Sequence, residues 1–520
     1  MAPWVAAPHF LAGLRSGKAA RARIWGAALV AALACGALVF NTIELGSTRD
    51  DQFYWIDTTS AVTRYLDREW PIDRETSIGP EPSDAQLYRA LDTCVRIMTR
   101  EAEKLPDRAF WRTVPAGGFL RKRQDLTGMP TFQDPGRALL LAWGYERLGG
   151  IAPNLLPWLA VIAMVPTLSW AIAELWLAGL PWAATVLGGL LACSPYVVQG
   201  LVLGHSPFGF YLVAVVCGIA LSAYAARSAP SAPGLLVRAL VSGGVFAVCI
   251  LCRGATLALF AGFLLPLVLA GWRVPNPASR GRRLSLVVLV VVAQLTPWFL
   301  VRPPQHHAVW TSFWEGLGDF DRTKGYVWDD TLTMEILKTE GLPASWVDLS
   351  SARTAAFLRA EIAADIRSDP LWYTRILAKR LLSTVFLWKL WPRASVDGST
   401  FAPKVWPNEG SIDRYYRAVP TVDIVAVGRH EVELPVAAMV APSFLFVAAA
   451  LGRRRLRVRA GAEARLRGGL IVLTCTTLAV LTLPVLLTTA GALEPQAIGL
   501  VYFLGLGLCL DALWSAEAWG

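Results

Sequence analysis

The chain contains 520 residues, of which 54% are hydrophobic and 17% are charged, against roughly 25% charged residues in soluble globular proteins. The mean hydropathy is +0.44, and several apolar runs approach the roughly 20 residues that cross a bilayer as a helix. The formal net charge is +10, but the composition excludes a nucleic-acid-binding domain, a disordered chain and a secreted disulfide scaffold. It predicts an all-α polytopic membrane protein.

The basic residues gather in four short clusters, which together hold 17 of the 49 Lys and Arg residues and one acidic residue, Glu463. The clusters are Arg15, Lys18, Arg21 and Arg23; Arg227 and Arg238; Arg273, Arg280, Arg282 and Arg283; and Arg453, Arg454, Arg455, Arg457, Arg459, Arg465 and Arg467. Basic residues next to apolar runs are typical of cytoplasmic loops, so we expect all four clusters and both termini on the cytoplasmic side.

The apolar runs between these clusters predict about ten transmembrane helices. They lie at roughly residues 24–45, 155–177, 180–200, 209–226, 236–252, 254–272, 284–301, 434–451, 470–490 and 494–513. The first has a basic region before an apolar core but no A-x-A-like cleavage site, which indicates a retained signal anchor. The sequence contains no internal repeat and no low-complexity tract.

The predicted organisation follows the chain in six parts. They are a cytoplasmic N-terminus (1–23), the first transmembrane helix (24–45), an external segment (46–154), a six-helix transmembrane core (155–301), a second external segment (302–433), and C-terminal transmembrane helices (434–520) with an Arg-rich cytoplasmic loop at 452–469. Both external segments are too long to be simple connectors, so we expect them to be structured.

We also expect helices that lie along the membrane surface in both predicted external segments. Helix-like stretches occur at 84–104 and 136–148, and the second is too short and too charged to span a bilayer. In the second segment, apolar residues recur every four positions in 353–369, and Pro370 begins a run to Trp391. That run contains three cations, which are costly at the centre of a bilayer, so we expect it to be interfacial or re-entrant.

The cysteines indicate no disulfide framework outside the membrane. Seven of the eight lie within predicted spans, which leaves Cys94 alone in the first external segment. Cys249 and Cys252 form a C-x-x-C pattern, but inside an apolar run it favours packing over redox chemistry.

The sharpest candidate for chemistry is an acidic pair just after the first span, in the run Thr48-Arg49-Asp50-Asp51-Gln52-Phe53-Tyr54-Trp55. Low-dielectric surroundings at a membrane surface can raise the pKa of a carboxylate towards the range of a general base, whereas Arg49 would keep it ionised. The alternative is that the pair caps a helix where it leaves the membrane.

The order of motifs resembles the C-type (GT-C) glycosyltransferases, integral membrane enzymes that use polyprenyl-phosphate sugars and include protein O-mannosyltransferases and aminoarabinose transferases. The resemblance covers roughly residues 24–330. After the acidic pair it continues with Asp134-Pro135-Gly136-Arg137-Ala138-Leu139-Leu140-Leu141, Leu148-Gly149-Gly150, Ser194-Pro195-Tyr196 and Leu251-Cys252-Arg253. Each motif alone is weak, and their order and predicted topology support the resemblance.

The resemblance implies that Asp50 or Asp51 is the catalytic base, which deprotonates an acceptor hydroxyl that attacks the anomeric carbon and displaces polyprenyl phosphate. The chain departs from the family at Arg49, where a small residue is usual, and at Gly204-His205-Ser206, where many members have an acidic residue. These departures leave metal dependence and donor binding open.

A phosphate leaving group needs cations, and several basic residues stand at the predicted external face. We expect Arg253, Arg302, His306 and His205 to bind the donor phosphate. Arg253 has a structural alternative, because an arginine at the end of a span can extend its side chain to the membrane surface.

Aromatic residues in the same region can stack on a sugar ring. We expect Tyr54, His307, Trp310 and Tyr326 to bind substrate. The alternative is interfacial anchoring, because Trp and Tyr concentrate at membrane surfaces.

The sequence leaves a divalent cation possible but does not favour one. Asp50, Asp51, His205, His306, His307, Asp329 and Asp330 share the predicted external face, but they lack close metal-ligand spacing. We therefore predict no metal site and no defined cofactor.

Walker motifs, glycine-rich phosphate loops and a G-x-S-x-G motif do not occur in the sequence.

The predicted function is a hexosyl- or pentosyltransferase that depends on a lipid-phosphate sugar, in a bacterial inner or plasma membrane, with its active site on the external or periplasmic face. Its partners would be a polyprenyl-phosphate sugar, an acceptor glycan, lipid or protein, and membrane lipids, with no nucleic acid. A transporter or flippase of lipid-linked sugars is the main alternative, although such proteins commonly show repeated halves. A non-catalytic subunit of a glycan assembly machine is the third hypothesis.

Overall fold

A computed structural model describes twelve continuous stretches of the chain and several isolated helical positions. The stretches are residues 18–44, 155–194, 207–227, 232–272, 309–318, 323–326, 330–344, 351–386, 422–427, 430–435, 460–486 and 497–517. The isolated positions include Gly136 and Leu140 in the first external segment and Val197, Val198 and Leu201 in the core.

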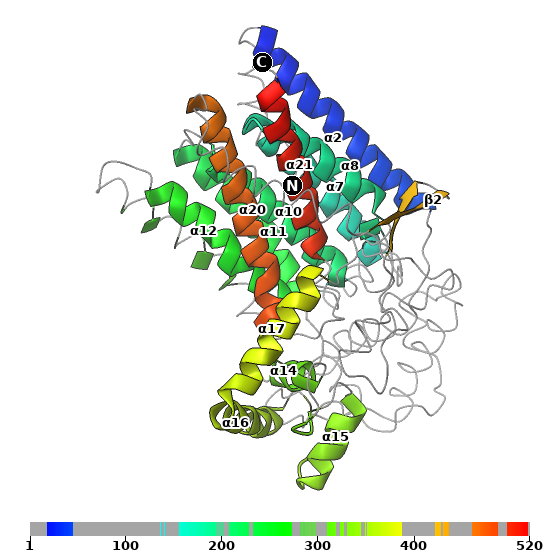
Figure 1. Cartoon of the computed structure of the whole chain (residues 1–520), viewed down its shortest axis with the longest axis vertical. Coiled ribbons are helices and arrows are strands. Elements are labelled where there is room, and N and C mark those ends of the chain that lie inside the picture. Colours follow the sequence, from blue (N-terminus) through cyan, green and yellow to red (C-terminus); the bar gives the residue numbers. More distant parts are fainter. Residues whose placement is uncertain are drawn as a thin grey trace, which may run out of the picture.

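Most described residues belong to a bundle of long apolar helices (Figure 1). The bundle contains α2 (Lys18–Glu44), α7 (Leu155–Leu177), α8 (Pro181–Cys193), α10 (Pro207–Ala225), α11 (Ala232–Cys252), the 3₁₀ helix η4 (Gly254–Ala258), α12 (Leu259–Trp272), α20 (Ala460–Leu486) and α21 (Ile498–Glu517). Their apolar composition indicates an integral membrane protein.

Three of the described helices are long and apolar enough to cross a membrane: Arg21–Thr42, Trp158–Leu177 and Pro233–Cys252. Five shorter apolar helices coincide with other predicted spans. They are Pro181–Cys193, Gly209–Ala225, Gly254–Leu265, Arg467–Thr482 and Ile498–Ala512. The predicted span at 284–301 lies mostly outside the described residues, and most of 434–451 does too, so the total of ten stays a prediction.

The turn between α7 and α8 reverses the chain and fixes which helix ends lie together. Gly179 has φ 83°, a left-handed conformation that glycine adopts without a steric penalty. Its N–H donates to the carbonyl of Trp176, and the Leu180 N–H donates to the carbonyl of Leu175, which is the Schellman pattern that ends a helix. Helices α7 and α8 therefore run antiparallel.

The first turn of α8 is capped by a residue from the far end of the chain. The backbone N–H groups of Trp182 and Ala183 donate to the two carboxylate oxygens of Asp511 at 2.9 Å each. An anion at this position satisfies N–H groups that have no partner within the helix. The contact places the carboxyl end of α21 beside the amino end of α8.

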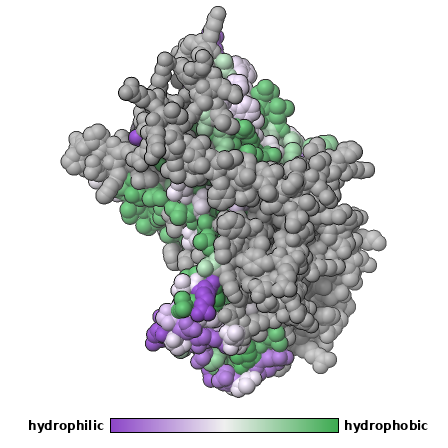
Figure 2. Space-filling model, in the orientation of Figure 1, coloured by the Kyte–Doolittle hydropathy of each residue, from purple (hydrophilic) through white to green (hydrophobic). Residues whose placement is uncertain are grey.

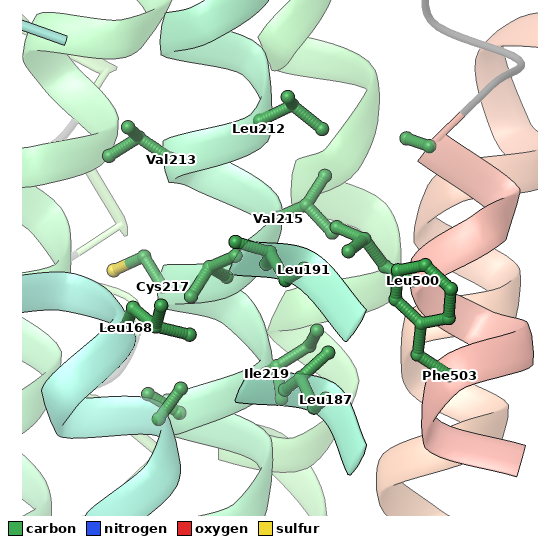
Figure 3. Close-up of a cluster of buried hydrophobic side chains, with 14 of the residues drawn as sticks. Leu168, Leu187, Leu191, Leu212, Val213, Val215, Cys217, Ile219, Leu500 and Phe503 are labelled. Atoms are coloured by element: carbon green, nitrogen blue, oxygen red, sulfur yellow. The ribbon is translucent and has the colours of Figure 1, made fainter. Parts of the chain in front are cut away.

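The interior of the bundle is closely packed apolar side chains (Figure 3). Leu168 of α7, Leu187 of α8, Ile219 of α10 and Phe503 of α21 meet there, and each is at most 2% exposed. Small residues allow the closest helix crossings: Gly262 of α12 lies against the backbone of Ala479 in α20. This use of glycine is typical of helices that pack within membranes.

The second segment predicted to be external (302–433) contains a smaller helical unit, made of α14 (Val309–Gly318), α15 (Asp330–Thr339), α16 (Ala352–Ser368) and α17 (Pro370–Phe386). Its core includes Trp314, Leu337, Leu358, Ile362 and Trp372. In Figure 1 the unit lies beyond one end of the bundle, where α17 meets α20. In Figure 2 hydrophilic residues gather on this unit, and hydrophobic residues cover the visible described surface of the bundle.

The sequence predicted α16 and the start of α17 closely. Ser351 accepts a hydrogen bond from the N–H of Thr354, and Asp369 accepts one from the N–H of Trp372. Ser and Asp are favoured caps, and proline is favoured at the first helical position. Leu358 and Ile362 face the core, as their spacing indicated.

The sequence did not predict the β-hairpin in the second segment predicted to be external. Strands β1 (Val422–Val427) and β2 (His430–Pro435) form an antiparallel hairpin, with Val427 opposite His430. The second strand extends to the first two positions of the span predicted at 434–451. Apart from this hairpin, regular secondary structure in the described residues is helical.

Candidate active site

The two ends of the bundle are chemically distinct. At one end, Asn41 of α2 donates to the carbonyl of Ala192 in α8 at 2.9 Å, and α11 ends at Cys252. At the opposite end, Glu174 of α7 lies with Arg238 of α11. The charge pattern predicts that the first end is external, so the sequence-predicted site belongs there.

Two motifs that are far apart in the sequence meet at this predicted external end. A Cβ atom built on Gly136 would lie 2.5 Å from the carbonyl carbon of Leu251 and 2.7 Å from the nitrogen of Cys252. Real Cβ atoms essentially never come so close to other heavy atoms, so only glycine fits here without displacing the chain. Gly136, in the first segment predicted to be external, therefore lies directly against the carboxyl end of α11.

Leu140 adds a second contact on the same side of this helical segment. It stands four residues after Gly136, so the two positions share one helix face. Leu140 packs against Leu156 at the start of α7. Both described positions of the predicted interfacial helix at 136–148 thus contact the bundle.

Arg253 is the residue after Leu251 and Cys252, against which Gly136 lies. It has an extended backbone between α11 and η4, with φ −148° and ψ 100°. Its N–H donates to the carbonyl of Cys249 at 2.8 Å, and its own carbonyl accepts from the N–H of Thr256 at 2.9 Å. The backbone is fixed on both sides, so the partly exposed side chain starts from a defined position. Its charge also suits the negative end of the α11 dipole.

Ser194 ends α8 and starts the next short helical run. The N–H of Val197 donates to its hydroxyl at 3.3 Å, and the N–H of Val198 donates to its carbonyl at 3.0 Å. Serine is a favoured helix cap, and Ser194 accepts both hydrogen bonds where α8 ends. Ser194 therefore has a structural role at this end of the bundle.

The second external segment contributes Trp310 at the start of α14. The guanidinium carbon of Arg359 lies 5.6 Å from the Trp310 ring centroid, and the Phe313 ring centroid is 6.1 Å away. Trp310 is partly exposed, so part of its surface remains open to a ligand.

Tyr326 occupies a different environment from the one predicted. It is 0% exposed, with the ring centroids of Trp314 and Trp372 at 4.4 and 5.6 Å. Its hydroxyl donates to Asp365 at 2.9 Å. Burial raises the pKa of the Tyr326 hydroxyl, and the hydrogen bond to Asp365 raises it further. The enclosed ring presents no open face to a sugar, which corrects the prediction that Tyr326 binds substrate.

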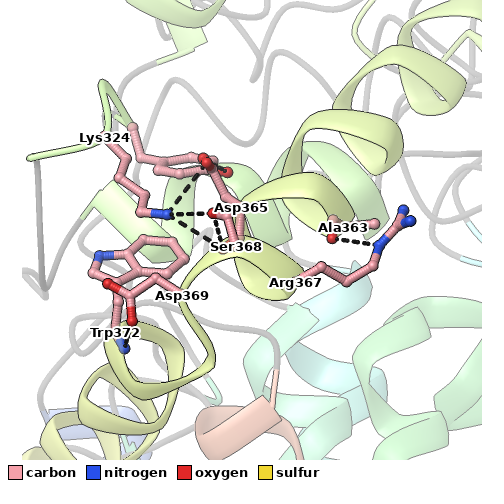
Figure 4. A network of polar contacts seen from close by, with 8 residues as sticks. Lys324, Ala363, Asp365, Arg367, Ser368, Asp369 and Trp372 are labelled. Carbon is pink, nitrogen blue, oxygen red and sulfur yellow. Dashed lines mark hydrogen bonds and ion pairs between the residues drawn. The ribbon is translucent and has the colours of Figure 1, made fainter.

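Lys324 completes the polar network around Tyr326 (Figure 4). Its ammonium lies 3.3 Å from the Asp365 carboxylate and 4.7 Å from the Trp372 ring centroid. It also donates to the Asp365 carbonyl and to the Ser368 hydroxyl. These contacts tie the loop before α15 to the end of α16, which indicates a structural role.

The remaining predicted site residues lie outside the described residues. They are Asp50, Asp51, Tyr54, His205, Arg302, His306 and His307. Their assignments stay predictions. Among the described residues, no group of three or more His, Cys, Asp or Glu side chains is arranged to hold a metal ion.

Glu174 was not predicted as a functional residue; it is 2% exposed and forms ion pairs with Arg227 and Arg238. An acidic residue near the end of an apolar run was the available signal, since such a charge needs a partner in the membrane. Both arginines were recognised as basic residues, but no sequence pattern indicated that they contact Glu174.

No family model matches the chain, and no curated protein matches it. Two solved structures from Archaeoglobus fulgidus are similar in a structure comparison. The oligosaccharyltransferase AglB in complex with an inhibitory peptide and a dolichol-phosphate is 14% identical, with 74% of this chain and 43% of that chain covered and a TM-score of 0.31. The oligosaccharyltransferase in the apo form is 13% identical, with 94% and 51% covered and a TM-score of 0.36. The chain thus spans about half the length of these proteins.

Proposed function

We propose that the chain is a membrane glycosyltransferase that transfers a sugar from a polyprenyl-phosphate donor to a hydroxyl group of a glycan, lipid or protein acceptor at the external face. The observation that supports this most is the seating of Gly136 on the carboxyl end of α11. It joins the external segment that contains the acidic pair to the backbone immediately before Arg253.

The proposed reaction needs a base and a cation but no general acid. One carboxylate, from Asp50 or Asp51, takes the proton of the acceptor hydroxyl, whose oxygen attacks the anomeric carbon. The bond from that carbon to the phosphate oxygen breaks, and polyprenyl phosphate leaves with the electron pair. Arg253 stabilises the charge that grows on the phosphate, with Arg302, His306 and His205 as further candidates.

The donor's lipid chain explains why such an enzyme needs an apolar bundle. Polyprenyl phosphate stays in the membrane, so its phosphate reaches the protein at the level where the spans end. Arg253 occupies such a position between α11 and η4. A guanidinium can bind phosphate oxygens through two parallel N–H groups, which fixes orientation as well as charge. Tyr54, His307 and Trp310 are the remaining candidates for contact with the sugar.

The experiment that tests the proposal compares Asp50→Asn and Asp51→Asn in purified protein. Sugar transfer from labelled polyprenyl-phosphate donors is measured against a panel of acceptors, and donor binding is measured separately. Neighbouring residues cannot generally reach the same hydroxyl, so we expect unequal effects. The base variant should lose on the order of a hundred-fold or more in turnover and still bind donor. Asp92→Asn, in the same segment, is the control.

Wild-type turnover in both single variants would contradict the assignment of the base. Movement of intact donor across vesicles without cleavage of the sugar–phosphate bond would instead support the transporter hypothesis.

A further inference from the structure

A compact charged cluster lies at the end of the bundle opposite Gly136. Glu174 of α7 is buried, and its Oε1 lies 2.5 Å from the Nε of Arg238 in α11. Its Oε2 lies 3.2 Å from an Nη of Arg227, just after α10. The indole N–H of Trp170, one turn earlier on α7, donates to the same carboxylate at 3.2 Å. One carboxylate thus joins three helices.

An aromatic ring holds both guanidinium groups in place. The centroid of Tyr224 in α10 lies 4.0 Å from the Arg238 guanidinium carbon and 5.4 Å from that of Arg227. Two arginines share one carboxylate, so this cluster has a net charge of +1. Because both side chains are already fixed, binding an anion here would cost little further conformational entropy.

Each guanidinium group has more N–H donors than its contacts within the described residues use, so some can bind a ligand. Each has five N–H groups. Within the described residues, Arg227 forms an ion pair with Glu174 through one nitrogen. Arg238 donates hydrogen bonds to Glu174 and to the carbonyl of Gly234. The side chains of Arg227 and Arg238 are 25% and 16% exposed, so the cluster is open to the surface on one side.

Apolar surface adjoins the charged cluster. Leu177 follows Glu174 on α7 and is 44% exposed, and Val237 and Val241 flank Arg238 on α11 and are 38% and 43% exposed. Helix α11 is long and apolar enough to span a membrane. Arg238 stands in its second turn, so the cluster lies at the depth of lipid headgroups, with acyl chains alongside.

We propose that Arg227 and Arg238 bind the phosphate of an anionic phospholipid, in the leaflet that the charge pattern predicts to be cytoplasmic. Glu174 and Tyr224 position the two guanidinium groups. A phosphodiester headgroup matches the excess charge, and the arginine fork matches the geometry of phosphate oxygens. Basic pockets between transmembrane helices are known to bind such headgroups. The adjoining apolar side chains favour a lipid over a free phosphate.

The test measures thermal unfolding of the purified full-length protein in neutral detergent. Phosphatidylglycerol should raise the unfolding temperature, whereas phosphatidylcholine with the same acyl chains and inorganic phosphate should not. Arg227→Gln removes the excess charge and leaves Glu174 paired with Arg238. It should weaken the response to phosphatidylglycerol about five-fold. Arg367→Gln is the control, because Arg367 is exposed on α16, outside the bundle.

Equal responses of wild type and Arg227→Gln, or equal effects of the two lipids, would overturn the proposal. An equal effect of inorganic phosphate would exclude the lipid and leave a free-phosphate site. A measurement on the wild type alone avoids any folding defect of the variant. From an equimolar mixture, native mass spectrometry should detect preferential retention of phosphatidylglycerol, and no preference would also overturn the proposal.

Discussion

At the scale of single residues, substitutions of Arg253 can distinguish a role in the reaction from a role at the membrane surface. If its guanidinium binds the donor phosphate, Arg253→Lys keeps the charge but loses the planar fork, so transfer should be only partly restored. Arg253→Ala should lower the rate on the order of a hundred-fold, as for the loss of one donor to a developing oxyanion. Transfer from a polyprenyl-phosphate donor is measured for both variants in the same detergent, together with their melting temperatures.

The structural alternative for Arg253 predicts a different result. An arginine that only reaches the membrane surface, or only interacts with the α11 dipole, can be replaced by lysine. A fully active Arg253→Lys enzyme would therefore assign phosphate binding to Arg302, His306 and His205.

Tyr326, by contrast, should affect the stability of the protein and not its activity. Tyr326→Phe removes the hydrogen bond to Asp365 and should lower the free energy of unfolding by about 1 kcal/mol at neutral pH, without changing the rate of transfer. Burial raises the pKa of the hydroxyl in the folded state. Its stabilisation is therefore complete below the ordinary pKa of 10 and is lost as the pH rises above it.

Thermal unfolding of wild type and Tyr326→Phe at neutral pH and above pH 10 checks this prediction. The difference between the two proteins should shrink at the higher pH. A large loss of transfer in a stable Tyr326→Phe variant would restore the original prediction that Tyr326 contacts substrate.

The difference between Trp310 and Tyr326 shows what the sequence could predict about single residues. Both are aromatic residues in the same external segment, and their types indicated affinity for a sugar or a membrane surface. Only the structure distinguishes the partly exposed Trp310 from Tyr326, which Trp314 and Trp372 enclose. Exposure depends on contacts between α14, α16 and α17, and residue type does not report those contacts.

At the scale of elements, the seat of Gly136 on α11 should control the position of the external segment. Gly136→Ala places a methyl group against the backbone of Leu251 and Cys252, so the segment must shift. A misplacement of about 1 Å can lower an enzymatic rate up to about a hundred-fold. We expect slower transfer with little change in the melting temperature of the bundle.

Gly244→Ala is the matched control, because Gly244 lies in α11 and an added Cβ there meets nothing within 4 Å. Its turnover should equal that of the wild type. If Gly136→Ala also keeps full turnover, the contact with α11 does not position the catalytic segment.

Local signals determined which elements the sequence could predict. The four-residue spacing of apolar residues in 353–369 and Pro370 are such signals, and the structure confirms α16 and the start of α17. The close approach of Gly136 to α11 could not be derived in this way. Leu251 is 115 positions away in the sequence, and no local property of a glycine identifies the backbone that will lie against it.

At the scale of the whole molecule, two carboxylates within the bundle fix how the helices are oriented relative to one another. Asp511 of α21 caps α8, and Glu174 joins α7 to Arg227 and Arg238. Both contacts lie near residues that the charge pattern predicts to be cytoplasmic. The Asn41 bond and the Gly136 contact lie at the other ends of the same helices. The helix directions in the bundle therefore agree with the order of sides predicted from arginine placement.

Labelling with a membrane-impermeant thiol reagent tests this orientation directly. Cysteines introduced as Asp92→Cys and Asp348→Cys should react in intact cells, whereas Arg280→Cys and Arg457→Cys should react only after the membrane is opened. The described native cysteines are free, and all but Cys193 are buried, so their background should be low. Cys94 lies outside the described residues and needs replacement by serine. If Asp92→Cys and Arg457→Cys report the same side, the topology predicted from arginine placement is wrong, and the proposal of a transfer site at the external face loses its basis.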